Sequence, residues 1–174
     1  MISSLILALL FSADVGNIDL ARYAGTWHEI ARLPNRFQKK CVGDVTAHYE
    51  LRDDGKIRVR NRCRIANGKV IEANGIARLA GNGKPNSILK VRFAPAFLSF
   101  IPQVWGDYQI RALAPDYSYA AVGSPDFRYL WILSRNSTMA PDTYHDLVEE
   151  MRRQGYAVDR LILSDPPDHN SRGH

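Results

Sequence analysis

The sequence has few of the features that metal centres, nucleotide sites and membrane-spanning helices require. Its 174 residues include only two cysteines, Cys41 and Cys63, and neither lies in a Cys-x-x-Cys or Cys/His metal-binding pattern. No glycine-rich phosphate loop or dinucleotide fingerprint is present. The apolar run at residues 1–13 is too short to span a bilayer. We therefore expect no metal site and no cofactor.

The charge is basic, but its distribution is not that of a nucleic-acid-binding protein. The chain carries 23 Lys and Arg against 18 Asp and Glu, a formal net charge of +5. No basic block alternates with stacking aromatic residues, as it would in a nucleic-acid-binding surface. The balance favours anionic partners and argues against nucleic acid. The length fits one domain with a sizeable core.

Residues 1–18 are predicted to be a secretory signal or an N-terminal arm. The apolar run ends at the small residue Ala13, which is typical of a secretory signal; an apolar arm packed on the domain is the alternative. Export to an oxidising compartment favours one disulfide between Cys41 and Cys63. Two buried free thiols are the alternative to that disulfide.

Alternating apolar and polar residues predict short strands over most of the chain. The expected strands are 23–32, 45–51, 57–64, 70–79, 89–93, 105–113, 117–122 and 128–134. Asp54-Gly55 lies in a tight hairpin turn, which brings Cys41 and Cys63 toward the same end of adjacent strands. Eight short antiparallel strands joined by hairpins are enough to close a barrel around one small ligand. The predicted fold is therefore an all-β, up-and-down barrel.

One α-helix is expected after the strands, packed on the outside of the barrel. Pro141 suits its first turn and Gly155 its end. Its apolar stripe consists of Tyr144, Leu147, Val148 and Met151. A short edge strand is expected within 156–162. Residues 164–174 have no apolar pattern and are predicted to be a disordered tail, so the domain spans residues 19–163.

Three motifs in this order resemble the lipocalin family. Gly25-x-Trp27 opens the first strand, Pro115-Asp116-Tyr117 forms a turn in the middle, and Arg135 follows the last barrel strand. The strings Trp-His-Glu-Ile-Ala-Arg-Leu-Pro, beginning at Trp27, and Gly-Ser-Pro-Asp resemble the bacterial outer-membrane lipocalins more specifically. The resemblance implies an eight-stranded barrel closed at one end by Arg135 stacked on Trp27. No cysteine follows the apolar run, so the lipid anchor of some relatives is not expected.

Small and aromatic residues are mixed at the positions expected to face inward. A barrel filled with its own side chains would place bulk at nearly every such position. The mixture therefore favours an apolar cavity with a few polar anchors, with a filled barrel as the alternative. The candidate ligand-binding residues, obtained by counting in twos along the strands, are Ala47, Tyr49, Val59, Asn61, Val91, Phe93, Tyr108, Ile110, Tyr119, Tyr129, Trp131 and Leu133.

Basic and apolar residues are expected together at the open end of the barrel. The candidate headgroup-binding residues are Arg36, Lys39, Lys40, Arg62 and Arg64. The loop at residues 94–102 is strongly apolar. A basic collar beside an apolar lip suits peripheral contact with an anionic membrane. The alternatives are that the third-strand arginines only solvate an outer face, and that the loop forms a lid or a homodimer interface.

No catalytic constellation is evident, so we expect a binding protein and not an enzyme. Glu29 is a candidate inward carboxylate, but one acid without a partner does not define acid–base chemistry. The predicted function is to bind and transport or store a fatty acid or lysophospholipid for cell-envelope lipid maintenance. The expected location is the periplasm, in association with the outer membrane. The alternatives are a lipocalin-type enzyme that depends on Glu29 and a dimeric interaction protein.

Overall fold

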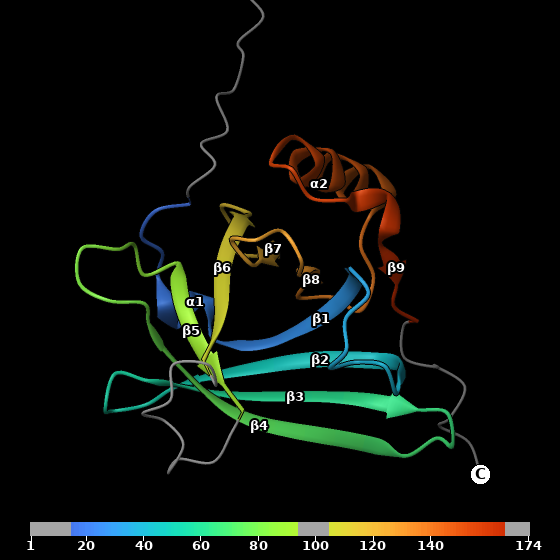
Figure 1. Cartoon of the computed structure of the whole chain (residues 1–174), viewed down its shortest axis with the longest axis horizontal. Helices are drawn as coiled ribbons and strands as arrows, with labels where there is room; N and C mark the ends of the chain where they lie inside the picture. The colour runs from blue at the N-terminus through green and yellow to red at the C-terminus, as the bar shows by residue number, and fades with distance from the viewer. Residues whose placement is uncertain (1–14, 94–104, 166–174) are drawn as a thin grey trace, which may run out of the picture.

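The computed structural model describes residues 15–93 and 105–165 (Figure 1). The predictions made for the remaining segments, namely the signal sequence, the apolar loop and the end of the tail, lie outside the described residues. Within the described ranges, no helix is long and apolar enough to cross a membrane.

Eight antiparallel strands close into a barrel, as the sequence predicts (Figure 1). Each strand pairs with the next along the chain, and β1 closes the barrel by pairing with both β2 and β8. The strands are β1 Gly25–Arg32, β2 Cys41–Leu51, β3 Ile57–Ile65, β4 Val70–Leu79, β5 Ile88–Arg92, β6 Gly106–Leu113, β7 Tyr119–Gly123 and β8 Leu130–Ser134. The hairpin turn between β2 and β3 uses the positive φ of Gly55, 75°.

A short helix that the sequence analysis did not predict precedes β1. Helix α1 spans Leu20–Tyr23, where the first strand was expected to begin. The Asp19 side chain accepts hydrogen bonds from the backbone N–H groups of Ala21 and Arg22, which satisfies two otherwise unpaired donors. The prediction of strand at Tyr23 was therefore wrong, because an N-cap and a single turn leave no apolar periodicity to detect.

Two hydrophobic clusters lie on opposite faces of the barrel wall. The inner cluster contains Trp27, Tyr49 and Val59, and the outer cluster contains Leu147 and Met151 of helix α2, Pro141–Arg153. Helix α2 therefore packs on the outside of the barrel, as expected.

Strand β7 is buried on both faces, which corrects one predicted site residue. Ala120 and Val122 belong to the inner cluster, whereas Tyr119 packs against the outer cluster. The register confirms this phase, since Ala120 pairs with the inward-facing Leu133. Counting in twos failed here because a strand covered on both sides has consecutive apolar residues and no alternation. Tyr119 is therefore not on the inner wall.

Residues 162–165 fill a split between β1 and β2. The two strands pair only over Gly25–His28, and β9, Ile162–Leu163, pairs with β1 beyond that point. Ser164 N–H then donates to the carbonyl of Ile30, and Asp44 N–H to that of Asp165. The edge strand expected within 156–162 is shorter and begins later, at Ile162, and Val158–Arg160 before it form the 3-10 helix η3.

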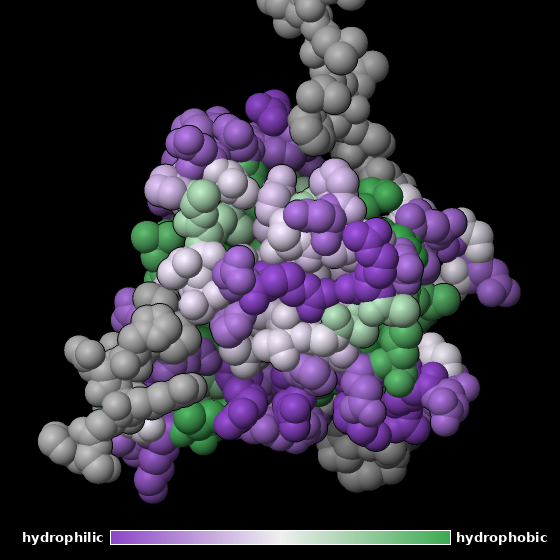
Figure 2. All heavy atoms as spheres, turned by 180° about the vertical axis from the view of Figure 1, so that it is seen from behind, coloured by the Kyte–Doolittle hydropathy of each residue, from purple (hydrophilic) through white to green (hydrophobic). Residues whose placement is uncertain are grey.

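A disulfide joins Cys41 and Cys63, with an S–S distance of 2.04 Å. It links the start of β2 to β3, where β-bulges interrupt the pairing of these strands. The prediction of a disulfide is confirmed. Seen from behind, the surface is mostly hydrophilic, with hydrophobic residues in small separate groups (Figure 2).

Candidate ligand-binding site

One end of the barrel is closed by Arg135 and Trp27. The guanidinium carbon of Arg135 lies 3.9 Å from the centre of the indole ring. Arg135 also donates hydrogen bonds to the carbonyls of Arg22 (2.6 Å), Tyr23 (3.1 Å) and Thr26 (3.0 Å). This is the stacking arrangement that the sequence analysis expected, and it ties the end of β8 to α1 and β1.

Three tyrosines form the floor of the interior, and we call them the tyrosine cluster: Tyr23, Tyr49 and Tyr108. The Tyr23 and Tyr108 hydroxyl oxygens are 2.7 Å apart, and Tyr108 donates to Tyr49 at 3.0 Å. Burial raises the pKa of Tyr49 to about 12 and raises the pKa values of Tyr23 and Tyr108 well above 10. Sequence analysis placed Tyr23 at the start of the first strand and did not include it among the ligand-binding candidates, whereas it ends α1 and points into the interior cluster.

The inner face is buried near the floor and open near the other end. Ile57 and Val59, low on β3, are 5% and 3% exposed. Ile71 lies opposite Cys63 at the other end of β3, and it is 40% exposed. Phe93, after β5, is 44% exposed. The exposed fraction of the inward-facing side chains therefore rises from the floor toward the other end of the barrel.

Most of the predicted ligand-binding residues lie on the inner wall. Those in the inner cluster, or packed against it, are Ala47, Tyr49, Val59, Val91, Tyr108, Ile110, Trp131 and Leu133. Asn61 pairs with Ala47 across β2 and β3 and shares its face. The ring of Phe93 lies over Gly75, where an added Cβ would approach within 2.8 Å of it. Tyr129 stacks on Trp131, with ring centres 5.9 Å apart, and touches Phe37 of the β1–β2 loop.

A polar network crosses the open end and holds the β1–β2 loop. The buried carboxylate of Glu29 accepts hydrogen bonds from Arg32 (2.6 Å) and Gln38 (2.5 Å), and from Ser164 (2.5 Å). Gln38 also accepts from the indole N–H of Trp131 at 2.8 Å. The loop is therefore tied to the inner wall and to the segment after β9. Sequence analysis singled out Glu29 but not these partners, which come from loops without periodicity.

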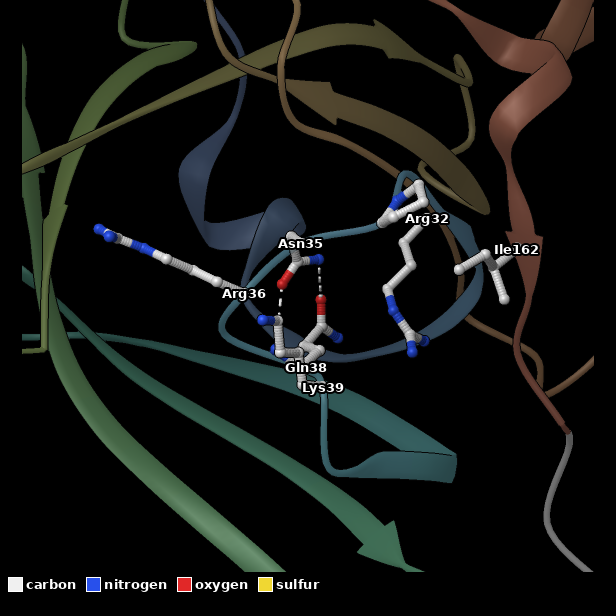
Figure 3. Close-up of a pocket in the computed structure, with 7 residues that line it drawn as sticks. Arg32, Asn35, Arg36, Gln38, Lys39 and Ile162 are labelled. Atoms are coloured by element: carbon white, nitrogen blue, oxygen red, sulfur yellow. Dashed lines mark hydrogen bonds between the residues drawn. The ribbon is translucent and has the colours of Figure 1, made fainter.

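A basic pocket of about 410 Å³ lies between the β1–β2 loop and β9 (Figure 3). Arg32, Arg36 and Lys39 line it, together with Asn35 and Ile162. Arg32 is paired with Glu29. Among the residues that the structure describes, Arg36, Lys39 and Lys40 have no acidic partner. These three cations remain available at the open end.

The other two predicted headgroup residues are neutralised by acids. Arg62 points to the outer face of β3 and lies 3.6 Å from Glu72. Arg64 donates to Asp44 at 2.9 Å. The alternation along β3 places Arg62 outside because the inward positions are Asn61 and Cys63. This arrangement fits the alternative that these arginines solvate the barrel wall.

No group of three or more potential metal ligands of the His, Cys, Asp or Glu type occurs in the described parts of the chain. Glu29 has no second carboxylate or histidine among its hydrogen-bonding partners. The chemistry that the interior offers is therefore apolar contact, with hydroxyl and amide groups at a few points.

Comparisons with known proteins agree with this geometry. Residues 18–166 match the family model described as a lipocalin-like domain. Temperature-induced lipocalin-1 of Arabidopsis thaliana is 41% identical over 162 residues, which cover 90% of this chain and 86% of the relative. The outer membrane lipoprotein Blc of Escherichia coli K12 is 36% identical, with 88% and 82% covered.

A solved structure shares the fold at lower identity. Insecticyanin from the tobacco hornworm Manduca sexta superposes with a TM-score of 0.66 at 22% identity, covering 90% of this chain and 85% of that one. The family match and the identities of the relatives settle the classification. The chain belongs to the lipocalin family, which binds small hydrophobic ligands.

Proposed function

We propose that this protein binds and carries a fatty acid or a lysophospholipid in its barrel, for lipid maintenance in the cell envelope. The observation that carries the proposal is the apolar inner wall, whose side chains become more exposed toward an end bearing cations without an acidic partner. An amphiphile with one acyl chain and an anionic head matches both parts of this arrangement.

The acyl chain is proposed to lie along the inner wall. Val91, Phe93 and Trp131 provide apolar contact in the upper part, and the tyrosine cluster limits the depth. Each buried methylene contributes about 0.8 kcal/mol to binding. We therefore expect affinity to rise with chain length until the chain reaches the tyrosine cluster, and then to level off.

The anionic head is proposed to remain at the open end. Arg36 and Lys39 line the basic pocket, and Lys40 follows them in the same loop. Charges at this rim also favour contact with an anionic membrane, which lets a lipid pass directly between the bilayer and the barrel. The name of the Blc relative supports a location in the periplasm next to the outer membrane.

A carrier function fits the state of Glu29 better than catalysis does. Among the described residues, the three hydrogen bonds to its carboxylate come from Arg32, Gln38 and Ser164, which hold the loop and the segment after β9. A carboxylate with these hydrogen bonds holds the loop and that segment in place, and it does not face a substrate. We therefore propose no catalytic residue.

Native mass spectrometry with lipid extraction tests the proposal. Protein purified from its own host is expected to carry a fatty acid or lysophospholipid near one per chain. A fluorescent fatty acid is expected to bind the delipidated protein. A protein that is empty and also takes up no fatty acid would contradict the proposal.

The variant Val91→Arg tests whether the inner wall is the site. A charged side chain on this wall is expected to abolish fatty acid binding, because it would place a charge among apolar side chains where the acyl chain must lie. Val70→Arg is the matched control, since Val70 precedes the inward-facing Ile71 and is 52% exposed. Normal binding by folded Val91→Arg would remove this part of the wall from the site.

A further inference from the structure

The three hydroxyl groups of the tyrosine cluster carry three protons, but only two hydrogen bonds join them, so one hydroxyl proton has no acceptor within the cluster. Tyr108 donates to Tyr49, so its single proton is committed. The contact between Tyr23 and Tyr108 must then be donated by Tyr23. The proton of Tyr49 has no acceptor in the cluster, although Tyr49 is only 8% exposed. A buried hydroxyl donor without an acceptor is costly and calls for an explanation.

Asn61 supplies an unpaired acceptor on the same wall. It is part-buried, and its Oδ1 is buried without a hydrogen-bond partner among the described residues. Its neighbours across the strands are Ala47 and Ala73, which offer no polar side-chain atom. Rotation about χ2 is soft for an amide, so Oδ1 can turn from the wall to the interior at little cost.

The Tyr49 hydroxyl, whose proton lacks an acceptor in the cluster, and the Asn61 amide are close neighbours in the sheet. Tyr49 pairs with Val59 and Asn61 pairs with Ala47, so Tyr49 and Asn61 are diagonal neighbours on one face. The Cα atoms of such neighbours lie about 7–8 Å apart. One small group of a ligand, placed between the two side chains, can therefore contact both. Asn61 is one step nearer the open end, just above the floor.

We infer that the Tyr49 hydroxyl and the Asn61 amide form a polar subsite that binds a hydroxyl group carried on the acyl chain of the ligand. A hydroxyl both accepts and donates hydrogen bonds, so it can accept one from the Tyr49 hydroxyl and donate one to Oδ1 of Asn61. A carbonyl only accepts, so it leaves Oδ1 of Asn61 without a donor. A plain methylene chain offers neither an acceptor for the Tyr49 proton nor a donor for Oδ1 of Asn61. This inference rests on the proposed function, because it concerns the acyl chain in the barrel.

The subsite predicts selectivity for hydroxylated chains at a defined position. The hydroxyl must lie at the depth of Asn61 when the head is at the basic pocket. Chains hydroxylated nearer the head or beyond the floor would bury their hydroxyl against apolar wall, which weakens binding. Selectivity of this kind arises because the polar groups of the subsite form hydrogen bonds only with a ligand that carries a matching hydroxyl. It is strong where those polar groups are buried.

Competition binding with stearic acid and its monohydroxylated positional isomers tests the inference. At least one isomer is expected to bind the wild-type protein about tenfold tighter than stearic acid. Asn61→Leu and Tyr49→Phe are each expected to bring that ratio close to one while stearic acid still binds. Asn74→Leu, on the outer face of β4, and Tyr144→Phe, on helix α2, are matched controls that should keep the full ratio.

The outcomes separate this inference from the proposed function. If stearic acid binds and no isomer binds tighter, the subsite is refuted and the carrier function stands. A preference that survives in both Asn61→Leu and Tyr49→Phe also refutes the subsite. If no acyl ligand binds the delipidated protein, the proposed function fails and the inference falls with it. The two variants alter different strands, so a folding defect in one leaves the other as the test.

Discussion

Replacing Arg135 with alanine should destabilise the barrel by about 3 kcal/mol. The substitution removes the stack on Trp27, at 3.9 Å, and hydrogen bonds to the carbonyls of Arg22, Tyr23 and Thr26. A partly buried cation–π contact contributes about 1 kcal/mol. Hydrogen bonds from a charged donor contribute about 1.5–3 kcal/mol where the acceptor stays buried, and less where water replaces the donor.

The carbonyls that Arg135 contacts keep different hydrogen-bond partners when Arg135 is replaced. Tyr23 keeps a hydrogen bond from the indole N–H of Trp27 at 2.8 Å, whereas Thr26 is exposed and can bind water. We therefore count only about 2 kcal/mol for all the lost hydrogen bonds together. Arg135→Lys keeps the charge but not the planar fork, so it should cost nearly as much.

Urea unfolding followed by tryptophan fluorescence measures this loss. The midpoint should fall while the slope stays unchanged, since the surface exposed on unfolding is the same. Arg60→Ala is a suitable control, because Arg60 is exposed on the outer face of β3 and should change stability by less than about 0.5 kcal/mol. A loss below about 1 kcal/mol for Arg135→Ala would refute the view that this residue closes the barrel.

Two further predictions concern the covalent link and the floor. The double variant Cys41→Ala with Cys63→Ala should lose about 3 kcal/mol in urea unfolding, since the bridge spans 22 residues; an unchanged midpoint would contradict this. Stability should also fall as pH rises from about 10 toward 12, because burial raises the pKa of Tyr49 to about 12 and the folded protein keeps protons that the unfolded chain releases. Ultraviolet absorbance titration checks this, and ionisation of every tyrosine near pH 10 in the folded protein would refute it.

The sequence predicted the barrel well wherever one face of a strand meets water. Strand β3 alternates Arg58 and Arg60 outside with Val59 inside, and its bounds were predicted to within one residue. The contact between Trp27 and Arg135 was expected because motifs at both ends of the chain resemble one family.

Sequence reasoning failed where local pattern carries no information. Strand β7 is covered on both faces, so its phase was predicted wrongly at Tyr119. The hydrogen bond between Glu29 and Ser164 joins residues 135 apart, and no periodicity marks either partner. The third member of the tyrosine cluster, Tyr23, lies on one turn of helix that only the Asp19 cap reveals. Long-range polar contacts of this kind depend on the closed fold itself.

The position of β1 has a consequence for the order in which this chain folds. Its partners include β8 and β9, and Arg135 reaches the carbonyl of Thr26 across 109 residues. Loop entropy opposes such distant contacts, so closure at β1 is a late step. Until β1 pairs with β8, the strands β1 to β8, each paired with its neighbour along the chain, form an open sheet with two free edges, which readily pair with another chain. A chain that ends before β8 would keep those edges, so its expected fate is association with other copies.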